Sequence, residues 1–307
     1  MKGQGVRKLF LALIGLLVVA GIFEAGDYVL GQPTRRTKAY FRFYRAWYAY
    51  CPLEAGKDWP HGLARFFEPF VPVWEEIEPG VHMWLDPYDM VSGVMLMSGQ
   101  WEAKTWQALQ PHVPVGGTFV DVGAHIGWYS LKAARLVGPQ GRVLAVEPNQ
   151  QTLVTLRDNI HASGADAVIV VLPVACADTE TTLTFYAAPR ANTGESSLSL
   201  TNASQDGPVV ASYQVRGRRL DDIVKEAGVT RVDAVKIDVE GAEFLVLKGA
   251  VETLDRYRPA VSVELIDQQL KSMGSSVSEV MAFMRSHRYS PIQTAEYNTV
   301  FLPVGPP

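Results

Sequence analysis

From residue 118 onward, short apolar runs alternate with longer amphipathic stretches. The apolar runs are rich in β-branched residues and end at an acid or a turn, which predicts strands, whereas the apolar spacing of the longer stretches predicts helices. The expected elements are strand 118–122, helix 126–137, strand 142–147, helix 149–162 and strand 167–172. This order predicts an α/β fold with a doubly wound, mostly parallel sheet, helices on both faces, and a ligand site at the carboxyl ends of the strands.

The same alternation continues toward the C-terminus. The expected elements are helices 220–227, 243–254 and 277–286, strands 233–238 and 260–264, and a closing antiparallel hairpin from 289–291 and 298–302. Between two β segments, 183–186 and 209–215, lies a stretch at 189–207 that is too polar for a core. A loop of this length is often a lid or a substrate-binding element, and a disordered insertion is the alternative.

The N-terminal part has a different pattern. Residues 9–23 form an unbroken run of apolar residues and glycine, preceded by Lys2, Arg7 and Lys8. This run predicts a membrane anchor or the core of a signal peptide, because it lacks a polar face; a buried core helix is the alternative. Basic residues also follow the run, so their distribution does not set its orientation.

The chain therefore divides into three expected segments. These are an anchor or signal-like segment at 1–31, a juxtamembrane or cap region at 32–110, and a main domain at 111–307. Residues 34–59 are rich in Tyr, Trp and Arg, which suits either a segment at the membrane surface or a helical cap on the main domain. The prolines near residues 61–78 predict an irregular connector there.

Composition narrows the class of protein. A chain of 307 residues with 48% hydrophobic content can bury one main core with an appendage. A formal net charge of −4 argues against a dedicated nucleic-acid binder, which usually presents a basic face. Cys51 and Cys176 fit neither a disulfide framework nor a zinc site.

The segment Phe119-Val120-Asp121-Val122-Gly123-Ala124-His125-Ile126-Gly127 joins an apolar strand to a helix through an acid and a glycine turn. This arrangement is typical of a nucleotide-cofactor pocket. A dinucleotide fold requires G-x-G-x-x-G, but only Gly123 and Gly127 are present here, and Asp121 ahead of them would repel a diphosphate. An acid attracts a cation instead, which favours S-adenosylmethionine with its sulfonium and ammonium groups. An NAD-dependent oxidoreductase is the alternative.

Further acids end the following strands. Glu147, followed by Pro148 and Asn149, closes the second strand, where an acid accepts hydrogen bonds from the ribose of a bound adenosine. Asp238 closes a later strand and is expected close to the transferred methyl group, with Glu240 in the same crevice. The helix-start acid Glu243 fits the dipole field at a helix N-terminus. Ordinary strand-end caps are the alternative for Asp121 and Glu147.

These motifs resemble the FkbM-type methyltransferases, a branch of the class I S-adenosylmethionine-dependent enzymes. The resemblance covers about 85–302 and rests on Asp121 to Ser130, Glu147-Pro148-Asn149, Lys236 to Glu243, and Gly99-Gln100-Trp101-Glu102. It implies a seven-stranded sheet and O-methylation of sugar or natural-product hydroxyls. The cofactor-binding residues it implies are Asp121, Gly123, Ala124, His125, Gly127, Glu147, Asn149, Asp238 and Glu102. His125 stands where Asn is more usual, and Leu265 where many relatives carry a His.

Methyl transfer to an alcohol requires alignment of the nucleophile and removal of its proton. The catalytic candidates are Asp238, Glu240 and Glu264, with His125 after them. Asp238 and Glu264 could hold Mg²⁺, but no spacing is specific to a metal, so no metal ligand is predicted.

The resulting hypothesis is a membrane-anchored O-methyltransferase whose catalytic domain faces the cytoplasm, where S-adenosylmethionine is made. Its expected acceptor is a small molecule or a glycan or lipid-linked sugar, and no nucleic-acid partner is expected. A non-catalytic, cofactor-binding membrane protein remains an alternative. The oligomeric state stays open.

Overall fold

The computed structural model describes residues 33–50, 70–295 and 297–305. These described residues form two compact units, one of 33–50, 70–77 and 84–101, and one of 78–83, 102–295 and 297–305. Among the described residues, no helix combines the length and the apolar character that a membrane span requires. The apolar run at 9–23, on which the anchor prediction rests, lies outside them.

The first unit contains two helices, α3 (Pro33–Tyr50) and α5 (Met90–Ser98), that pack on each other. Aromatic side chains of α3 are buried, and the ring of Tyr40 lies 4.9 Å from that of Phe70. Strands β1 (Val73–Glu78) and β2 (Val81–Leu85) pair in a two-stranded sheet. The prediction of an irregular connector up to residue 78 was therefore wrong for β1, where Val73 packs inward in alternation with an exposed Trp74.

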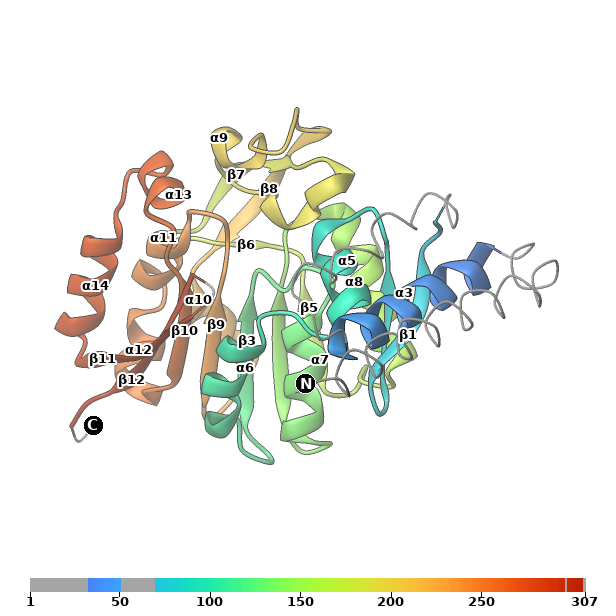
Figure 1. The fold of residues 1–307 in the computed structure, drawn as a ribbon. Coiled ribbons are helices and arrows are strands. Elements are labelled where there is room, and N and C mark those ends of the chain that lie inside the picture. Colours follow the sequence, from blue (N-terminus) through green and yellow to red (C-terminus); the bar gives the residue numbers. More distant parts are fainter. Residues whose placement is uncertain (1–32, 51–69, 296, 306–307) are drawn as a thin grey trace, which may run out of the picture. The chain divides into compact units, whose positions relative to one another are not determined.

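The second unit is built on a seven-stranded sheet with the strand order β11-β12-β10-β9-β3-β4-β5 (Figure 1). Its strands are β3 (Thr118–Val122), β4 (Arg142–Val146), β5 (Ile169–Leu172), β9 (Ala234–Ile237), β10 (Ala260–Glu264), β11 (Tyr289–Ala295) and β12 (Asn298–Pro303). Strands β5, β4, β3, β9 and β10 run parallel, whereas β12 is antiparallel to both β10 and β11. The predicted mostly parallel sheet is confirmed.

Helices cover both faces of this sheet (Figure 1). They are α6 (Ala103–Leu109) with the short η2 (Gln110–His112), α7 (Trp128–Val137), α8 (Gln150–Ala162), α10 (Leu220–Glu226), α11 (Glu243–Lys248), α12 (Val251–Tyr257), α13 (Asp267–Ser272) and α14 (Val277–Ser286). Helix α6 packs on β10, β11 and β12, and α7 packs on β3, β4 and β5. The buried core includes Val120, Val235 and Val261 on the central strands, so the ends of these strands are held rigidly.

One predicted helix is two helices. The pattern at 243–254 predicted a single helix, but α11 ends at Lys248 and α12 begins at Val251. The break follows from contacts with distant parts of the chain. A Cβ on Gly249 would lie 2.1 Å from the Ala177 carbonyl oxygen, and the Asp221 carboxylate caps the start of α12 by accepting the Thr253 N–H at 2.8 Å.

A second, three-stranded sheet has the order β6-β8-β7, formed by β6 (Ala175–Cys176), β8 (Ala211–Arg218) and β7 (Thr181–Ala187). Between β7 and β8 runs a polar insert, residues 188–210, that contains the short helices η3 (Arg190–Glu195) and α9 (Leu200–Ala203). In Figure 1 this part lies at the upper edge of the unit, where β3 and β9 end. The polar insert therefore borders the edge at which a ligand was expected.

Candidate active site

Asp121, in β3 just ahead of the glycine loop at 123–127, is an acid whose hydrogen bonds are incomplete. Asp121 is buried, and its Oδ2 accepts the Ser130 hydroxyl at 2.6 Å. Its Oδ1 is buried and has no hydrogen-bond partner among the described residues. Burial raises the pKa of this carboxyl, and the nearby Lys236 ammonium opposes that shift. A buried carboxylate oxygen without a donor is suited to a ligand that brings a cation or a donor.

Glycine at 123 is required by a close approach of two loops. Gly123 has φ +84°, and a Cβ built on it would lie 1.7 Å from the carbonyl oxygen of Asp238. Its N–H donates to the Val146 carbonyl at 2.9 Å. The glycine loop is therefore fixed between the ends of β9 and β4.

Glu147 holds the same loop from the end of β4. Its two carboxylate oxygens accept the N–H groups of His125 at 2.7 Å and of Asn149 at 2.8 Å. Burial raises the pKa of Glu147 to about 7, and these two hydrogen bonds oppose the shift. Asn149 in turn caps α8 through Gln151 N–H. Both residues thus shape the loop, and their contact with a ribose remains a prediction.

The polar insert crosses the ends of three strands. Beside the glycine loop, Thr193 Oγ1 lies 2.8 Å from His125 Nε2. Beside β4, Ser196 Oγ accepts the Asn149 side-chain amide at 3.0 Å. Beyond β9, the Glu240 carbonyl accepts the Asn202 amide at 2.8 Å. The insert therefore covers the predicted cofactor loops, as a lid or substrate-binding element would.

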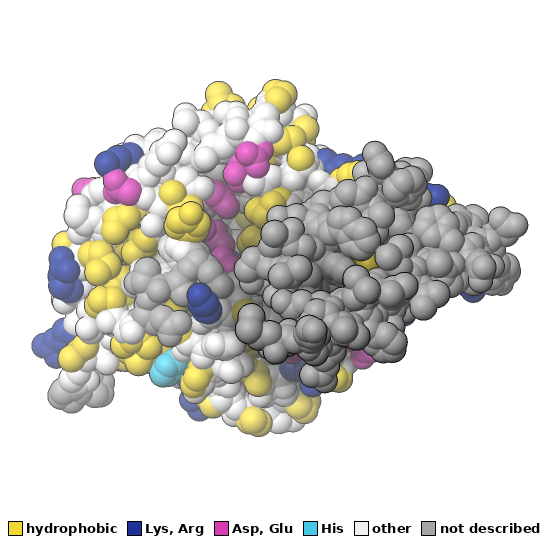
Figure 2. Space-filling model, viewed as in Figure 1, with side chains coloured by type: hydrophobic (Ala, Val, Ile, Leu, Met, Phe, Trp, Pro, Cys, Tyr) yellow, Lys and Arg dark blue, Asp and Glu magenta, His cyan; other side chains and the backbone are white. Residues whose placement is uncertain are grey.

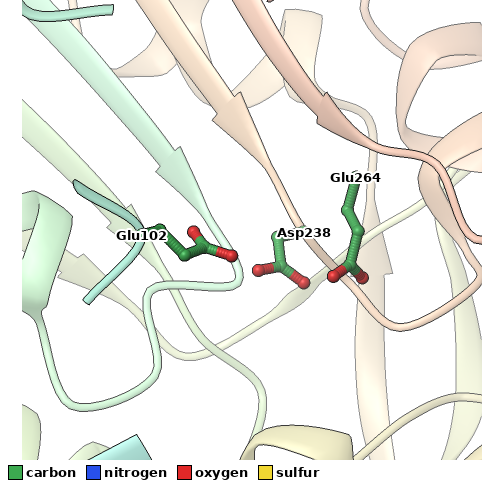
Figure 3. A group of neighbouring side chains, drawn as sticks. All are labelled: Glu102, Asp238 and Glu264. Atoms are coloured by element: carbon green, nitrogen blue, oxygen red, sulfur yellow. The ribbon is translucent and has the colours of Figure 1, made fainter. Parts of the chain in front are cut away.

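Three acids meet at the carboxyl edge of the sheet. Glu102, ahead of α6, Asp238, after β9, and Glu264, at the end of β10, each offer a carboxylate oxygen within 4.8 Å of the others. Figure 3 shows the three carboxylates pointing toward one another. In Figure 2, acidic side chains gather in a recess near the middle of the viewed face. We call these three residues the acid cluster.

The members of the acid cluster differ in their partners. Asp238 Oδ2 accepts the buried Lys236 ammonium at 2.7 Å. Glu102 accepts the Tyr129 hydroxyl at 2.7 Å and the Asn298 side-chain amide at 3.0 Å, and burial raises its pKa to about 7. Glu264 is 8% exposed, and its buried Oε2 has no hydrogen-bond partner among the described residues. Burial first, and then Asp238, raises the pKa of Glu264 well above its usual value.

Glu240 and Glu243, two residues of the same acidic motif, lie in different surroundings. Glu240 has φ +54°, and its Oε2 accepts the Gln269 side-chain amide at 2.5 Å. Burial raises the pKa of Glu240 well above its usual value. Glu243 Oε1 accepts the N–H groups of Val239 and Gly241 at 3.0 and 3.1 Å, so this acid closes the turn before α11. Its role is structural, as its helix-start position indicated.

Several residues of the site carried no functional prediction. They are Lys236, Tyr129, Asn298 and Gln269, which all contact an acid of the site. Lys236 had a signal in the sequence, because a lysine inside an apolar strand is seldom buried without an acidic partner. Tyr129 lies within the motif at 121–130, but its contact with Glu102, like the contacts of Asn298 and Gln269, joins distant segments and depends on the fold.

The site fits S-adenosylmethionine better than a dinucleotide. The unpartnered Asp121 oxygen and the acid cluster offer negative charge to a cofactor that carries ammonium and sulfonium groups. The same acids would repel the diphosphate of NAD. Asp121 lies in β3, one residue before its end. The loops after β3 and β4 hold Gly123, Ala124, His125, Gly127, Glu147 and Asn149, and Asp238 lies against Gly123.

Comparison with known proteins gives several methyltransferases. Methyltransferase 1 of Beauveria bassiana is 30% identical over 168 residues, which are 51% of this chain and 67% of that protein. The 2-O-methyltransferase NoeI of Sinorhizobium fredii is 43% identical over 65 residues, 21% of this chain and 25% of that protein. The hexuronic acid methyltransferase AglP of Haloferax volcanii is 28% identical over 134 residues, 44% of this chain and 50% of that protein. Each similarity therefore spans only part of the relative.

Among solved structures, methyltransferase FkbM from Methylobacillus flagellatus KT is similar with a TM-score of 0.42 and 17% identity, over 69% of this chain and 52% of that one. The family model of the methyltransferase FkbM domain matches residues 121–291, from Asp121 through the polar insert to the start of the last hairpin. Because this match covers more than half of the chain and includes the glycine loop and the acidic strand ends, the protein belongs to the FkbM family of methyltransferases.

Proposed function

We propose that this methyltransferase uses S-adenosylmethionine to methylate a hydroxyl group of a sugar, a glycolipid or a natural product. The observation that carries the proposal is the buried, unpartnered Oδ1 of Asp121, just ahead of the glycine loop and at the same sheet edge as the acid cluster. An oxygen in this state is stabilised when a ligand supplies a donor or a positive charge.

When bound, the cofactor supplies a methyl group activated by a positively charged sulfur. The task of the chain is to align the acceptor, exclude water and accept a proton. Asp121 and Glu147 hold the cofactor side of the site in this account. The polar insert shields the cofactor side of the site from solvent, because hydrogen bonds join the insert to His125, Asn149 and the Glu240 backbone.

The acceptor side is formed by acids. An alcohol that becomes methylated loses a proton, and a positioned carboxylate can take that proton at one of its oxygens. Glu240 and Glu264 both have a raised pKa, which makes each a stronger base than an exposed glutamate. Lys236 donates to Oδ2 of Asp238, so Asp238 orients the acceptor molecule through its other oxygen, Oδ1.

The acceptor class is suggested by relatives. NoeI is named a 2-O-methyltransferase and AglP a hexuronic acid methyltransferase, which supports an oxygen nucleophile on a sugar. The NAD-dependent oxidoreductase, by contrast, has no support from the family match.

We also propose that residues 9–30 tether the enzyme to a membrane, with the catalytic unit in the cytoplasm. The support is the apolar run in the sequence and the site of synthesis of the cofactor. Cell fractionation with protease protection tests this. A full-length chain in the membrane fraction and digestible from the cytoplasmic side supports the tether, whereas a shortened chain released into the periplasm or medium contradicts it.

The proposed reaction is tested with the full-length chain, labelled S-adenosylmethionine and a panel of sugars, uronic acids and lipid-linked sugars. We expect label in an O-methyl ether, and a Glu240→Gln variant that lowers kcat by about 100-fold or more with little change in KM for the cofactor. Label found only on nitrogen or carbon acceptors would contradict the O-methyltransferase proposal.

A further inference from the structure

The acid cluster has the geometry of a cation site. We propose that Glu102, Asp238 and Glu264 bind a divalent cation with a preference for oxygen ligands, Mg²⁺ or Mn²⁺, and that hydroxyl oxygens of the acceptor complete its coordination. One oxygen from each residue lies within 4.8 Å of the other two. Two oxygens on one Mg²⁺ lie at most about 4.2 Å apart, because each bond is about 2.0–2.1 Å long, so a small inward movement of the three carboxylates would place them in one coordination shell.

A second observation at the cluster indicates a missing ligand. Glu264 is 8% exposed, its Oε2 is buried without a hydrogen-bond partner among the described residues, and its carboxylate points toward Asp238 (Figure 3). A carboxylate removed from water is costly unless a donor or a cation compensates it. Sequence alone suggested only Asp238 and Glu264, and the fold adds Glu102 as the third ligand.

Lys236 does not supply this compensation. Its ammonium donates to Asp238 Oδ2 at 2.7 Å and lies 4.8 Å from the centre of the Tyr129 ring. The charges that act on Glu264 come from Asp238, Glu240, Glu243 and Glu102, which are all acids. Lys236 thus pairs with Asp238, and a divalent cation that displaces the protons of Glu102 and Glu264 would balance their two carboxylates.

The coordination indicates the kind of acceptor. Three carboxylate oxygens leave about half of an octahedral shell to water or substrate. Adjacent oxygens of a sugar diol or a hydroxy acid can occupy two such positions, and a cation lowers the pKa of a hydroxyl that it binds. With Glu264 as a ligand, Glu240 is left as the proton acceptor. This last step rests on the proposed methyl transfer to oxygen, whereas the cation site itself does not.

The test is titration of the full-length chain with MnCl₂, followed by calorimetry and by the electron paramagnetic resonance of free Mn²⁺, with and without S-adenosylhomocysteine. We expect one Mn²⁺ per chain and binding that is weaker by about tenfold or more in Glu264→Gln. The matched control is Asp89→Asn, a buried acid that caps α5 and is not among the charges that act on Glu264. Its affinity for Mn²⁺ should stay within about twofold.

Two results would overturn the cation site: no Mn²⁺ binding by the folded wild-type chain, or equal binding by wild type and Glu264→Gln. If Glu264→Gln fails to unfold cooperatively, Asp238→Asn gives the same comparison. Titration with S-adenosylhomocysteine in the absence of Mn²⁺ distinguishes failure of the cation site from failure of the cofactor proposal. If the thioether binds and Mn²⁺ does not, the cation site is wrong while the methyltransferase proposal stands. If Mn²⁺ binds and the thioether does not, the cation site stands and the cofactor proposal is wrong.

Discussion

The backbone of Gly123 lies directly against the carbonyl group of Asp238, so closely that a Cβ at position 123 would come within 1.7 Å of the carbonyl oxygen. The Asp238 N–H also donates to the Val122 carbonyl at 3.0 Å. The cofactor loop after β3 and the acidic loop after β9 therefore share one rigid contact. A substitution that moves the backbone of one loop should therefore also move the backbone of the other.

Gly123→Ala should destabilise the protein by about 2–4 kcal/mol and abolish cofactor binding, because it combines a positive φ with a backbone clash. Urea unfolding measures the loss. The control is Gly164→Ala, which has φ +63° but no atom within 4 Å of the added carbon, and should cost only about 1 kcal/mol. Equal losses at the two positions would mean that the contact with Asp238 is unimportant.

Local sequence patterns predicted much of the sheet. The strand expected at 118–122 is β3 with the same bounds, because its five residues are all buried, four of them are β-formers, and a glycine turn follows. The acid cluster was only partly predictable. Because Glu102 and Glu264 are 162 positions apart in the sequence, no local pattern indicates that their side chains lie close together. The break at Gly249 was missed for the same reason, since the Ala177 and Asp221 contacts that cause it are tertiary.

The stability of the protein should fall as pH rises from about 5 to 7.5, in part through Glu243. Burial raises the pKa of Glu243 from 4.5 to about 7. Between these values the unfolded chain has lost the proton and the folded chain retains it, so unfolding is increasingly favoured, by up to roughly 1.4 kcal/mol per pH unit. This contribution is complete below pH 4.5 and is lost above pH 7.

Glu243→Gln tests that assignment. The amide keeps Oε1 as acceptor for Val239 and Gly241 but has no proton to lose. Urea unfolding at several pH values should give a shallower decline in the free energy of unfolding than in wild type. An unchanged slope would show that Glu243 does not hold a proton in the folded protein.

Asn202→Ala should loosen the polar insert. The buried Asn202 amide donates to the carbonyl oxygens of Glu240 at 2.8 Å and Gln269 at 3.3 Å, and its removal leaves these acceptors without that donor. Hydrogen exchange should become faster across 190–207 by about tenfold, with little change in the central strands. Thr201→Ala, at an exposed neighbour on α9, should leave exchange unchanged. Faster exchange throughout the unit would mean that Asn202 supports the whole fold rather than the insert.

His125 contributes to the loop through its backbone conformation as well as through its ring. It has φ +50°, which asparagine tolerates and β-branched residues do not. His125→Asn should therefore keep stability within about 0.5 kcal/mol, whereas His125→Val should lose about 2 kcal/mol. Chemical denaturation of the two variants measures the difference. Equal stability of the two variants would contradict the conformational role.

The central claim is that the loop from Asp121 to Gly127 holds S-adenosylmethionine. Calorimetric titration of the full-length chain with S-adenosylhomocysteine, with NAD as comparison, tests it most directly. We expect one thioether per chain at micromolar affinity, no heat from NAD, and at least about tenfold weaker binding in Asp121→Asn. The control Asp89→Asn replaces a buried acid that caps α5, where asparagine serves as well. Thioether affinity that is the same in wild type and Asp121→Asn, or binding of NAD alone, would contradict the account.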